Sequence, residues 1–169
     1  TRPGSQFIDG VCLACINYDN RKDIDFGWRQ KGFDWICEDR KRVGAEYDCV
    51  CPVSGGKDST LIVSELVKRG MKPLLISVLD EFTKSKAGAH NIKNIAERFD
   101  LDHIMFRCSP RTFKKETLKD FENELHPLKW IEERIYTIPV KIAKQFKIPL
   151  VFYGEHSDYE YGASDTLDM

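Results

Sequence analysis

Seven residues that stand between an apolar run and an amphipathic run constrain the fold of this chain more than any other feature. Positions 54–60 read Ser-Gly-Gly-Lys-Asp-Ser-Thr. They follow the largely apolar segment 47–53, and apolar residues then recur at helical spacing across 61–67. This order predicts a buried strand, a glycine turn and an amphipathic helix.

The glycine turn predicts an anion-binding site. Gly55 and Gly56 allow the backbone to turn sharply and to bring its N–H groups close to a ligand. The positive end of the following helix points to the same place, and Lys57 adds a cation. Hydroxyl donors come from Ser54, Ser59 and Thr60. These groups suit the phosphate or pyrophosphate of a nucleotide, whereas the alternative is a turn that only links a strand to a helix.

Strand-like and helix-like runs alternate from residue 46 onward. Strands are predicted near 47–53, 73–78, 103–106 and 149–153, and helices near 58–69, 86–99, 112–124 and 132–146. Short apolar strands that alternate with helices predict an α/β fold, a doubly wound and mostly parallel sheet. Ligands bind such sheets beyond the carboxyl ends of the strands. The loops expected there are 54–60, 79–87, 107–111 and 154–162.

Residues 1–45 are predicted to form a small cysteine-containing appendage to this nucleotide-binding domain, which covers 46–169. Its first twenty residues look like a loop, and a helix is expected at about 26–40. Cys12 and Cys15 have the spacing of half a zinc site, but a structural zinc needs four ligands, and the sequence has no second pair with this spacing. Two unpaired thiols in a loop are the alternative.

The other cysteines and one aromatic corner leave further alternatives open. Cys49 and Cys51 alternate along the first strand, so both are expected on one buried face. Cys108 follows the third strand, where it is either a structural residue or a nucleophile that needs a base nearby. Residues 126–130 could line a sugar pocket or form a packed corner.

Charge and hydropathy exclude several classes of protein. The net charge of the 169 residues is −1, and one mildly basic stretch, 107–119, suits a solvated helix face, so a nucleic-acid binder is not expected. No apolar run approaches the roughly 20 residues of a membrane span, and no secretory signal is visible. Six cysteines beside a nucleotide loop suit a reduced, cytoplasmic location.

The seven-residue motif resembles the Ser-Gly-Gly-x-Asp-Ser motif of the PP-loop ATP pyrophosphatases. It departs from the usual nucleotide P-loop, because Cys51 stands five residues before Gly56 and Asp58 follows Lys57. Within that superfamily the chain is similar to N-acetyl sugar amidotransferases of surface-polysaccharide (lipopolysaccharide) and flagellar-glycan (pseudaminic acid) biosynthesis. The stretches that carry this similarity are Thr1-Arg2-Pro3, 10–15, 47–60, 73–75, 91–95, 139–143 and 148–155.

The resemblance implies an AMP-forming enzyme with an adenine nucleotide α-hydrolase-like fold. ATP and Mg²⁺ are its implied cofactors, and Ser54, Gly55, Gly56, Lys57, Asp58, Ser59 and Thr60 would bind the pyrophosphate portion of ATP. Lys57 and Asp58 would be catalytic, the first by stabilising developing charge and the second by placing Mg²⁺ together with Glu155 or Asp158. Val78 and Leu79 would meet the adenine at the end of the second strand, and Gly154 would complete the site. A solvated acidic loop is the alternative for Glu155.

The same resemblance implies a substrate and partners. ATP would adenylylate the acetamido oxygen of a free or nucleotide-linked N-acetyl sugar, and ammonia would then displace AMP to give an acetamidino sugar. A glutaminase and a cyclase-like subunit, resembling those of histidine biosynthesis, would supply the ammonia. Zinc is implied for the intact protein. Because the family is about twice as long and opens with an earlier cysteine pair, the chain is expected to be an N-terminal fragment.

Two other functions compete with this one. A tRNA-modifying PP-loop enzyme could use Cys108 to carry sulfur in a thiolation reaction. A non-catalytic module could bind ATP without turning it over. Fold alone does not separate these three, because function depends on the site.

Overall fold

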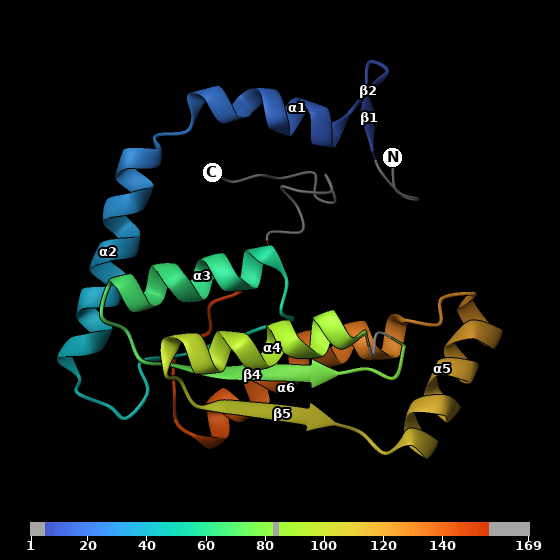
Figure 1. Cartoon of the computed structure of the whole chain (residues 1–169). Helices are drawn as coiled ribbons and strands as arrows, with labels where there is room; N and C mark the ends of the chain where they lie inside the picture. The colour runs from blue at the N-terminus through green and yellow to red at the C-terminus, as the bar shows by residue number, and fades with distance from the viewer. Residues whose placement is uncertain (1–5, 83–84, 156–169) are drawn as a thin grey trace. The chain divides into compact units, whose positions relative to one another are not determined.

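The computed structural model describes residues 6–82 and 85–155, which fall into two compact units (Figure 1). One unit contains the described part of residues 1–35 together with Glu155. The other comprises Ile36–Gly154 and contains the parallel sheet. The boundary expected between residues 45 and 46 stays a prediction.

The first unit begins with a small hairpin. Strands β1 (Phe7–Ile8) and β2 (Val11–Cys12) pair antiparallel, and Asp9 and Gly10 between them have φ values of 50° and 79°. Positive φ at both central residues is the geometry of the two-residue hairpin turn. Helix α1 (Leu13–Asn20), the short 3-10 helix η1 (Arg21–Asp23) and helix α2 (Phe26–Arg42) follow, and α2 belongs to the second unit from Ile36 onward.

The expectation of a loop over the first twenty residues is wrong for the described part. Residues 7–20 form the hairpin and α1 instead. The residue that α1 buries is the polar Asn17, while Tyr18 is exposed. An apolar periodicity therefore could not reveal this helix. The helix expected at 26–40 is confirmed as α2.

The parallel sheet of the second unit has β3 (Cys49–Pro52), β4 (Pro73–Leu79) and β5 (His103–Arg107) in that spatial order. Residues 150–152 lie along the other side of β3. There the Val50 N–H donates to the Leu150 carbonyl at 2.9 Å, and Val50 accepts from the Phe152 N–H at 2.9 Å. The predicted strand over 149–153 is thus a single parallel bridge at Val151, since Pro149 has no N–H to extend the ladder.

The order of strands confirms the doubly wound fold. The chain passes from β3 to β4 to β5 in one direction and then returns to the opposite side of β3. The strand order therefore reverses between β3 and residues 150–152. Ligands of open α/β sheets bind at such a reversal, beyond the carboxyl ends of the strands.

Helices cover both faces of the sheet (Figure 1). On one face Val50, Leu74 and Ile76 form a buried cluster with Ile138 and Ile142 of helix α6 (Lys129–Gln145). Alternate strand residues point to the other face, where helices α3 (Lys57–Lys68) and α4 (Lys86–Phe99) pack. The buried side chains that α3 and α4 contribute are Val63, Leu66 and Ile95.

Cys49 and Cys51 are confirmed as core residues. Both are fully buried, and burial raises the pKa of Cys51 to about 12. Burial also raises the pKa of Cys49 far above the ordinary value. Neither thiol is therefore available as a thiolate near neutral pH.

Helix α5 (Pro110–Glu124) and α6 meet at a packed corner. The Ser109 hydroxyl caps α5 by accepting from the Thr112 N–H at 3.2 Å, and Pro110 opens the first turn, so α5 begins two residues earlier than predicted. At the start of α6, the Trp130 N–H donates to Asp120 Oδ2 at 2.7 Å. The Trp130 ring lies edge-to-face with Phe113 at 6.1 Å. Residues 126–130 therefore form a packed corner.

Within the described ranges, no helix combines the length and the apolar character that a membrane span requires.

Buried Ser77 and half-buried His103 form a polar pair that supports the end of β3. The Ser77 hydroxyl donates to the Val53 carbonyl at 2.6 Å, and His103 Nε2 lies 2.9 Å from the same hydroxyl oxygen. Since the hydroxyl proton is used on Val53, Nε2 must carry the proton that the Ser77 oxygen accepts. His103 Nδ1 is buried and has no partner among the described residues.

This pair predicts a pH-dependent stability. Burial lowers the pKa of His103 below its ordinary value of 6.5. As pH falls below about 6.5, the unfolded chain takes up a proton that the folded chain accepts only at lower pH, so the free energy of unfolding should decrease. Denaturant unfolding should be measured between pH 7.5 and 5.5, a range of roughly two units around the ordinary pKa of histidine. Over this range the free energy of unfolding should decrease less in His103→Gln than in the wild-type protein.

The matched control is His90→Gln, at an exposed position on α4. It should keep the pH dependence of the wild-type protein. Equal pH dependence of the wild-type protein and His103→Gln would contradict the role of this polar pair.

Candidate functional site

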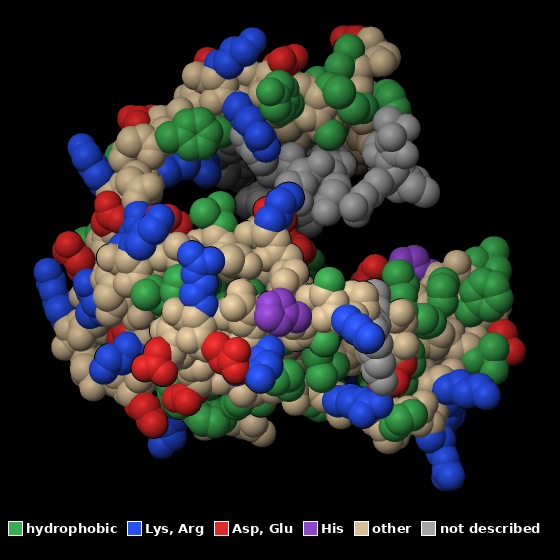
Figure 2. Space-filling view, in the orientation of Figure 1, with side chains coloured by type: hydrophobic (Ala, Val, Ile, Leu, Met, Phe, Trp, Pro, Cys, Tyr) green, Lys and Arg blue, Asp and Glu red, His purple; other side chains and the backbone are tan. Residues whose placement is uncertain are grey.

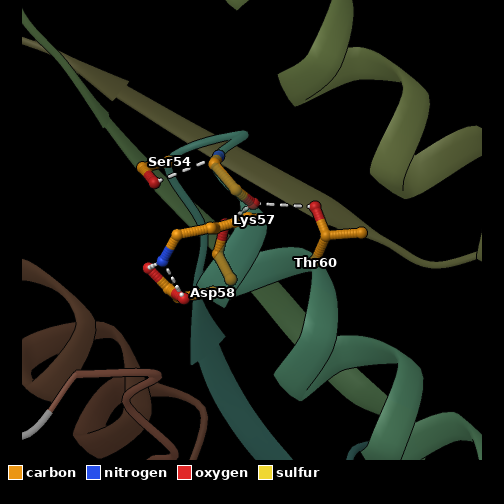
Figure 3. Close-up of polar contacts among 6 residues, drawn as sticks. Ser54, Lys57, Asp58 and Thr60 are labelled. Carbon is orange, nitrogen blue, oxygen red and sulfur yellow. Dashed lines mark hydrogen bonds and ion pairs between the residues drawn. The ribbon is translucent and has the colours of Figure 1, made fainter.

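The glycine turn predicted at 54–56 joins the carboxyl end of β3 to the first turn of α3 (Figure 3). Gly55 has φ +80°, and a Cβ atom there would lie 2.9 Å from Ile92 Cγ1 and 3.0 Å from the Ile92 backbone nitrogen. Both observations exclude a side chain at this position. Helix α4 therefore packs directly against the turn.

The first turn of α3 has no side-chain cap. Its N-cap residue is Gly56, which has no side chain, and the described residues around it provide none. The first N–H groups of a helix have no partner within the helix, and they favour negative charge. The backbone N–H groups of Asp58 and Ser59 in this turn are suited to an anion.

The hydroxyl groups of the motif brace the turn itself. Thr60 Oγ1 and Ser59 Oγ donate to the Gly56 carbonyl at 2.8 and 3.1 Å (Figure 3). Ser54 Oγ accepts from the Gly56 N–H at 3.4 Å. These contacts fix the direction of the backbone around Gly56, and a direct role of the three hydroxyls in binding an anion stays a prediction.

Lys57 and Asp58 form an ion pair in front of the turn. Lys57 Nζ lies 2.7 and 2.8 Å from the two carboxylate oxygens of Asp58 (Figure 3). The side chains are 87% and 49% exposed, so the pair contributes little to stability. The ammonium group can therefore move to an incoming phosphate at small cost.

Gly154 meets the same turn of α3, as the sequence predicted for a site residue after the last strand. A Cβ atom on Gly154 would lie 3.2 Å from the Asp58 carbonyl oxygen and 3.4 Å from Ile62 Cγ2. The segment after 150–152 thus closes against α3 at the reversal of strand order. Glu155 is exposed and belongs to the other compact unit.

The residues predicted to meet an adenine lie at the end of β4. Val78 and Leu79 are the last two residues of that strand and are half-buried. The loop beyond them is tied to β5, because Arg107 Nε donates to Glu81 Oε1 at 2.7 Å. This ion pair was not anticipated from the sequence, and it steadies the loop beside the end of β4.

A cavity of about 520 Å³ opens between α3 and α4, next to the glycine turn. Helix α3 contributes Thr60 and Ser64 to its walls, and α4 contributes Asn91, Asn94 and Arg98. These three residues of α4 were not among the site residues predicted from the sequence. Their spacing of three and four residues was the available signal, since it puts them on one face of the helix.

Metal ligands do not cluster in the described part of the chain. No group of three or more His, Cys, Asp or Glu side chains suited to a metal occurs in residues 6–82 and 85–155. The roles of Asp58 and Glu155 toward Mg²⁺ stay predictions. Asp158 lies outside the described residues.

Cys12 and Cys15 lie at the start of α1 with their sulfur atoms 3.1 Å apart. The side-chain hydrogen bond between the two sulfur atoms lowers the pKa of Cys12 and raises the pKa of Cys15. Zinc binding by this pair stays a prediction. Cys108 is half-buried directly after β5, and its role stays equally open.

Charged side chains of both signs are interspersed over the visible face of the protein (Figure 2). Lys and Arg side chains alternate there with Asp and Glu, in keeping with the net charge of −1. A continuous basic surface of the kind that binds nucleic acid is not seen on this face.

Comparison with solved structures shows the fold of the chain. It is similar to the structure of NMN synthetase from Francisella tularensis, with a TM-score of 0.58 and 16% identity over 76% of this chain and 53% of that one. It also matches a predicted subunit of tRNA methyltransferase from Methanocaldococcus jannaschii, with a TM-score of 0.45 and 21% identity over 70% of this chain and 58% of that one.

The first similarity shows that the fold is of the PP-loop, adenine nucleotide α-hydrolase-like type. The chain spans about half the length of the NMN synthetase structure. No protein-family model matches the chain, and comparison with curated proteins finds no significant match.

The turn geometry generates a prediction about Gly55. Gly55→Ala should lower the free energy of unfolding by more than the roughly 1–2 kcal/mol of a positive φ alone, because its Cβ also collides with Ile92. The matched control is Gly44→Ala, where φ is +65° and no atom lies within 4 Å. Denaturant unfolding of both variants measures the difference. An equal loss of unfolding free energy in the two variants would show that α4 moves away from the new Cβ atom without a free-energy cost.

Proposed function

We propose that this chain is the ATP-binding part of an AMP-forming enzyme of the PP-loop type. The observation that carries the proposal is the uncapped first turn of α3 behind a glycine turn that α4 holds in place. The fold similarity to a PP-loop protein supports it. A turn that only linked β3 to α3 would not need an α4 backbone contact that excludes every side chain at Gly55.

The roles of the turn residues follow from their chemistry. The pyrophosphate portion of ATP would accept hydrogen bonds from the first N–H groups of α3, with Lys57 balancing its charge. Asp58 is an exposed carboxylate in this turn, so it suits Mg²⁺, which keeps several waters and takes one or two carboxylates. Glu155 is our second candidate ligand. The adenine would lie beside Val78 and Leu79 at the end of β4.

For the acceptor we propose the acetamido group of an N-acetyl sugar. Its oxygen would attack the α-phosphorus of ATP, forming an O–P bond while the bond to pyrophosphate breaks. Ammonia would then add to the activated carbon, and AMP would leave with the former amide oxygen. The support is the sequence resemblance over most of the chain, including residues 47–60 and 148–155.

A separate glutaminase and a cyclase-like subunit would deliver the ammonia, and the reaction would take place in the cytoplasm. The partners are proposed from the sequence resemblance, and the location from the six cysteines beside the nucleotide loop. The experiment below varies the acceptor, because proteins that share a fold can act on different substrates.

The deciding experiment measures pyrophosphate and AMP release by the whole protein. The assay contains ATP, Mg²⁺ and an ammonium salt, with one acceptor at a time: UDP-N-acetyl sugars, free N-acetyl sugars, nicotinate mononucleotide or tRNA. Release that depends on an N-acetyl sugar would support the amidotransferase. Release that depends only on nicotinate mononucleotide, or only on tRNA, would identify that compound as the acceptor in place of an N-acetyl sugar. ATP binding without release under all conditions would indicate a non-catalytic module.

Lys57 is expected to be needed for turnover. Lys57→Ala should reduce pyrophosphate release by roughly 10²–10³-fold, the effect of removing one preorganised electrostatic contact from a transition state. The side chain is 87% exposed, so the fold should survive. The matched control is Lys68→Ala in the last turn of α3, where Lys68 pairs with Glu65 at 2.7 Å. Unchanged turnover in Lys57→Ala would remove this residue from the mechanism.

A further inference from the structure

The cavity between α3 and α4 is lined at one end by residues of the proposed ATP site, Gly55, Gly56, Lys57 and Thr60, and elsewhere by polar side chains that this site does not use. Asn91, Asn94 and Arg98 follow one another at intervals of three and four residues, so they form one row along the face of α4. Ser64 faces this row from α3. Leu61 and Phe99 add apolar wall.

These polar groups have no partners in the described part of the chain. Within residues 6–82 and 85–155, the side chains of Ser64, Asn91 and Asn94 make no hydrogen bond, and Arg98 makes no ion pair. Arg98 stacks on the Phe99 ring with its guanidinium carbon 5.7 Å from the ring centre. Lys93 on the same helix is instead paired with Glu97 at 3.2 Å. The cavity thus gathers solvent-accessible hydrogen-bonding groups and one cation that forms no ion pair with the described residues.

One end of the row reaches the glycine turn. A Cβ atom on Gly55 would lie 3.2 Å from Asn91 Cβ, so Asn91 stands beside the turn. Arg98 follows seven residues later, which corresponds to about 10 Å along a helix. The cavity volume of about 520 Å³ falls in the range of small-molecule sites. A single small ligand can therefore extend from the turn to Arg98.

We propose that this cavity binds the acceptor substrate, and that the acceptor carries a phosphate or carboxylate group, which Arg98 binds. A planar guanidinium suits such oxygens, since it donates two parallel hydrogen bonds. Asn91, Asn94 and Ser64 contact the polar body of the acceptor, and its reactive end lies toward Lys57. This assignment rests on the proposed function, because it takes the glycine turn as the ATP site.

The test compares two probes that differ by one phosphate. N-acetylglucosamine 1-phosphate and N-acetylglucosamine are titrated into the protein by calorimetry, with a non-hydrolysable ATP analogue and Mg²⁺ present. The wild-type protein should bind the phosphate ester about tenfold more tightly or better, as expected for a charged hydrogen-bonded pair. Arg98→Ala should remove that preference while leaving the affinity for the ATP analogue unchanged. Lys93→Ala, a cation removed from the same helix outside the cavity, should retain the preference.

Three results would overturn the acceptor site. They are equal affinity of the wild-type protein for both probes, a preference that survives in Arg98→Ala, and a loss of ATP-analogue affinity in Arg98→Ala, which would make the cavity part of the ATP site. Failure of the proposed function looks different. The protein could show a phosphate preference that depends on Arg98 and yet not bind the ATP analogue. That result would support an anion site at Arg98 and contradict the proposed PP-loop enzyme.

Discussion

The structure depends on the complete burial of β3. Val50 has no exposed surface, and neither have Cys49 and Cys51 on either side of it. Strand β4 borders β3 on one side and residues 150–152 border it on the other, while helices cover both faces. Because β3 is covered along both edges and both faces, the chain that follows it reaches the surface only beyond the end of the strand. The turn at 54–56 therefore lies at the edge of the sheet, where buried and exposed backbone meet.

The turn is also rigid before any ligand arrives. Its carbonyl at Gly56 already accepts from two hydroxyl groups, and the Val53 carbonyl accepts from Ser77. Ile92 of α4 lies so close to Gly55 that a Cβ atom would not fit between them. Binding an anion here would thus require little ordering of the backbone, which removes one of the usual free-energy costs of association. The exposed Lys57–Asp58 ion pair lies in front of this braced turn.

The sequence predicted the features that depend on local pattern. Apolar runs located β3, β4 and β5, and the Gly-Gly turn located the start of α3, because strand burial and glycine conformations leave direct marks on composition. Helix α1 was missed because its buried residue is Asn17. The single bridge at Val151 and the cavity between α3 and α4 could not be foreseen either. Both depend on the distances between neighbouring helices and strands in the folded protein. The periodicity of a single sequence does not contain these distances.

The contact between Gly154 and α3 has a consequence for how the protein is made. Val50 pairs with Val151, about 100 residues later in the chain, and Gly154 then closes on the first turn of α3. Contacts between residues so distant in sequence form late, because a long loop must close first. During synthesis the strands β3 to β5 can assemble while the central strand still has one open edge. The glycine turn reaches its final surroundings only after residue 154 has left the ribosome, so the proposed nucleotide binding should be absent from shorter nascent chains.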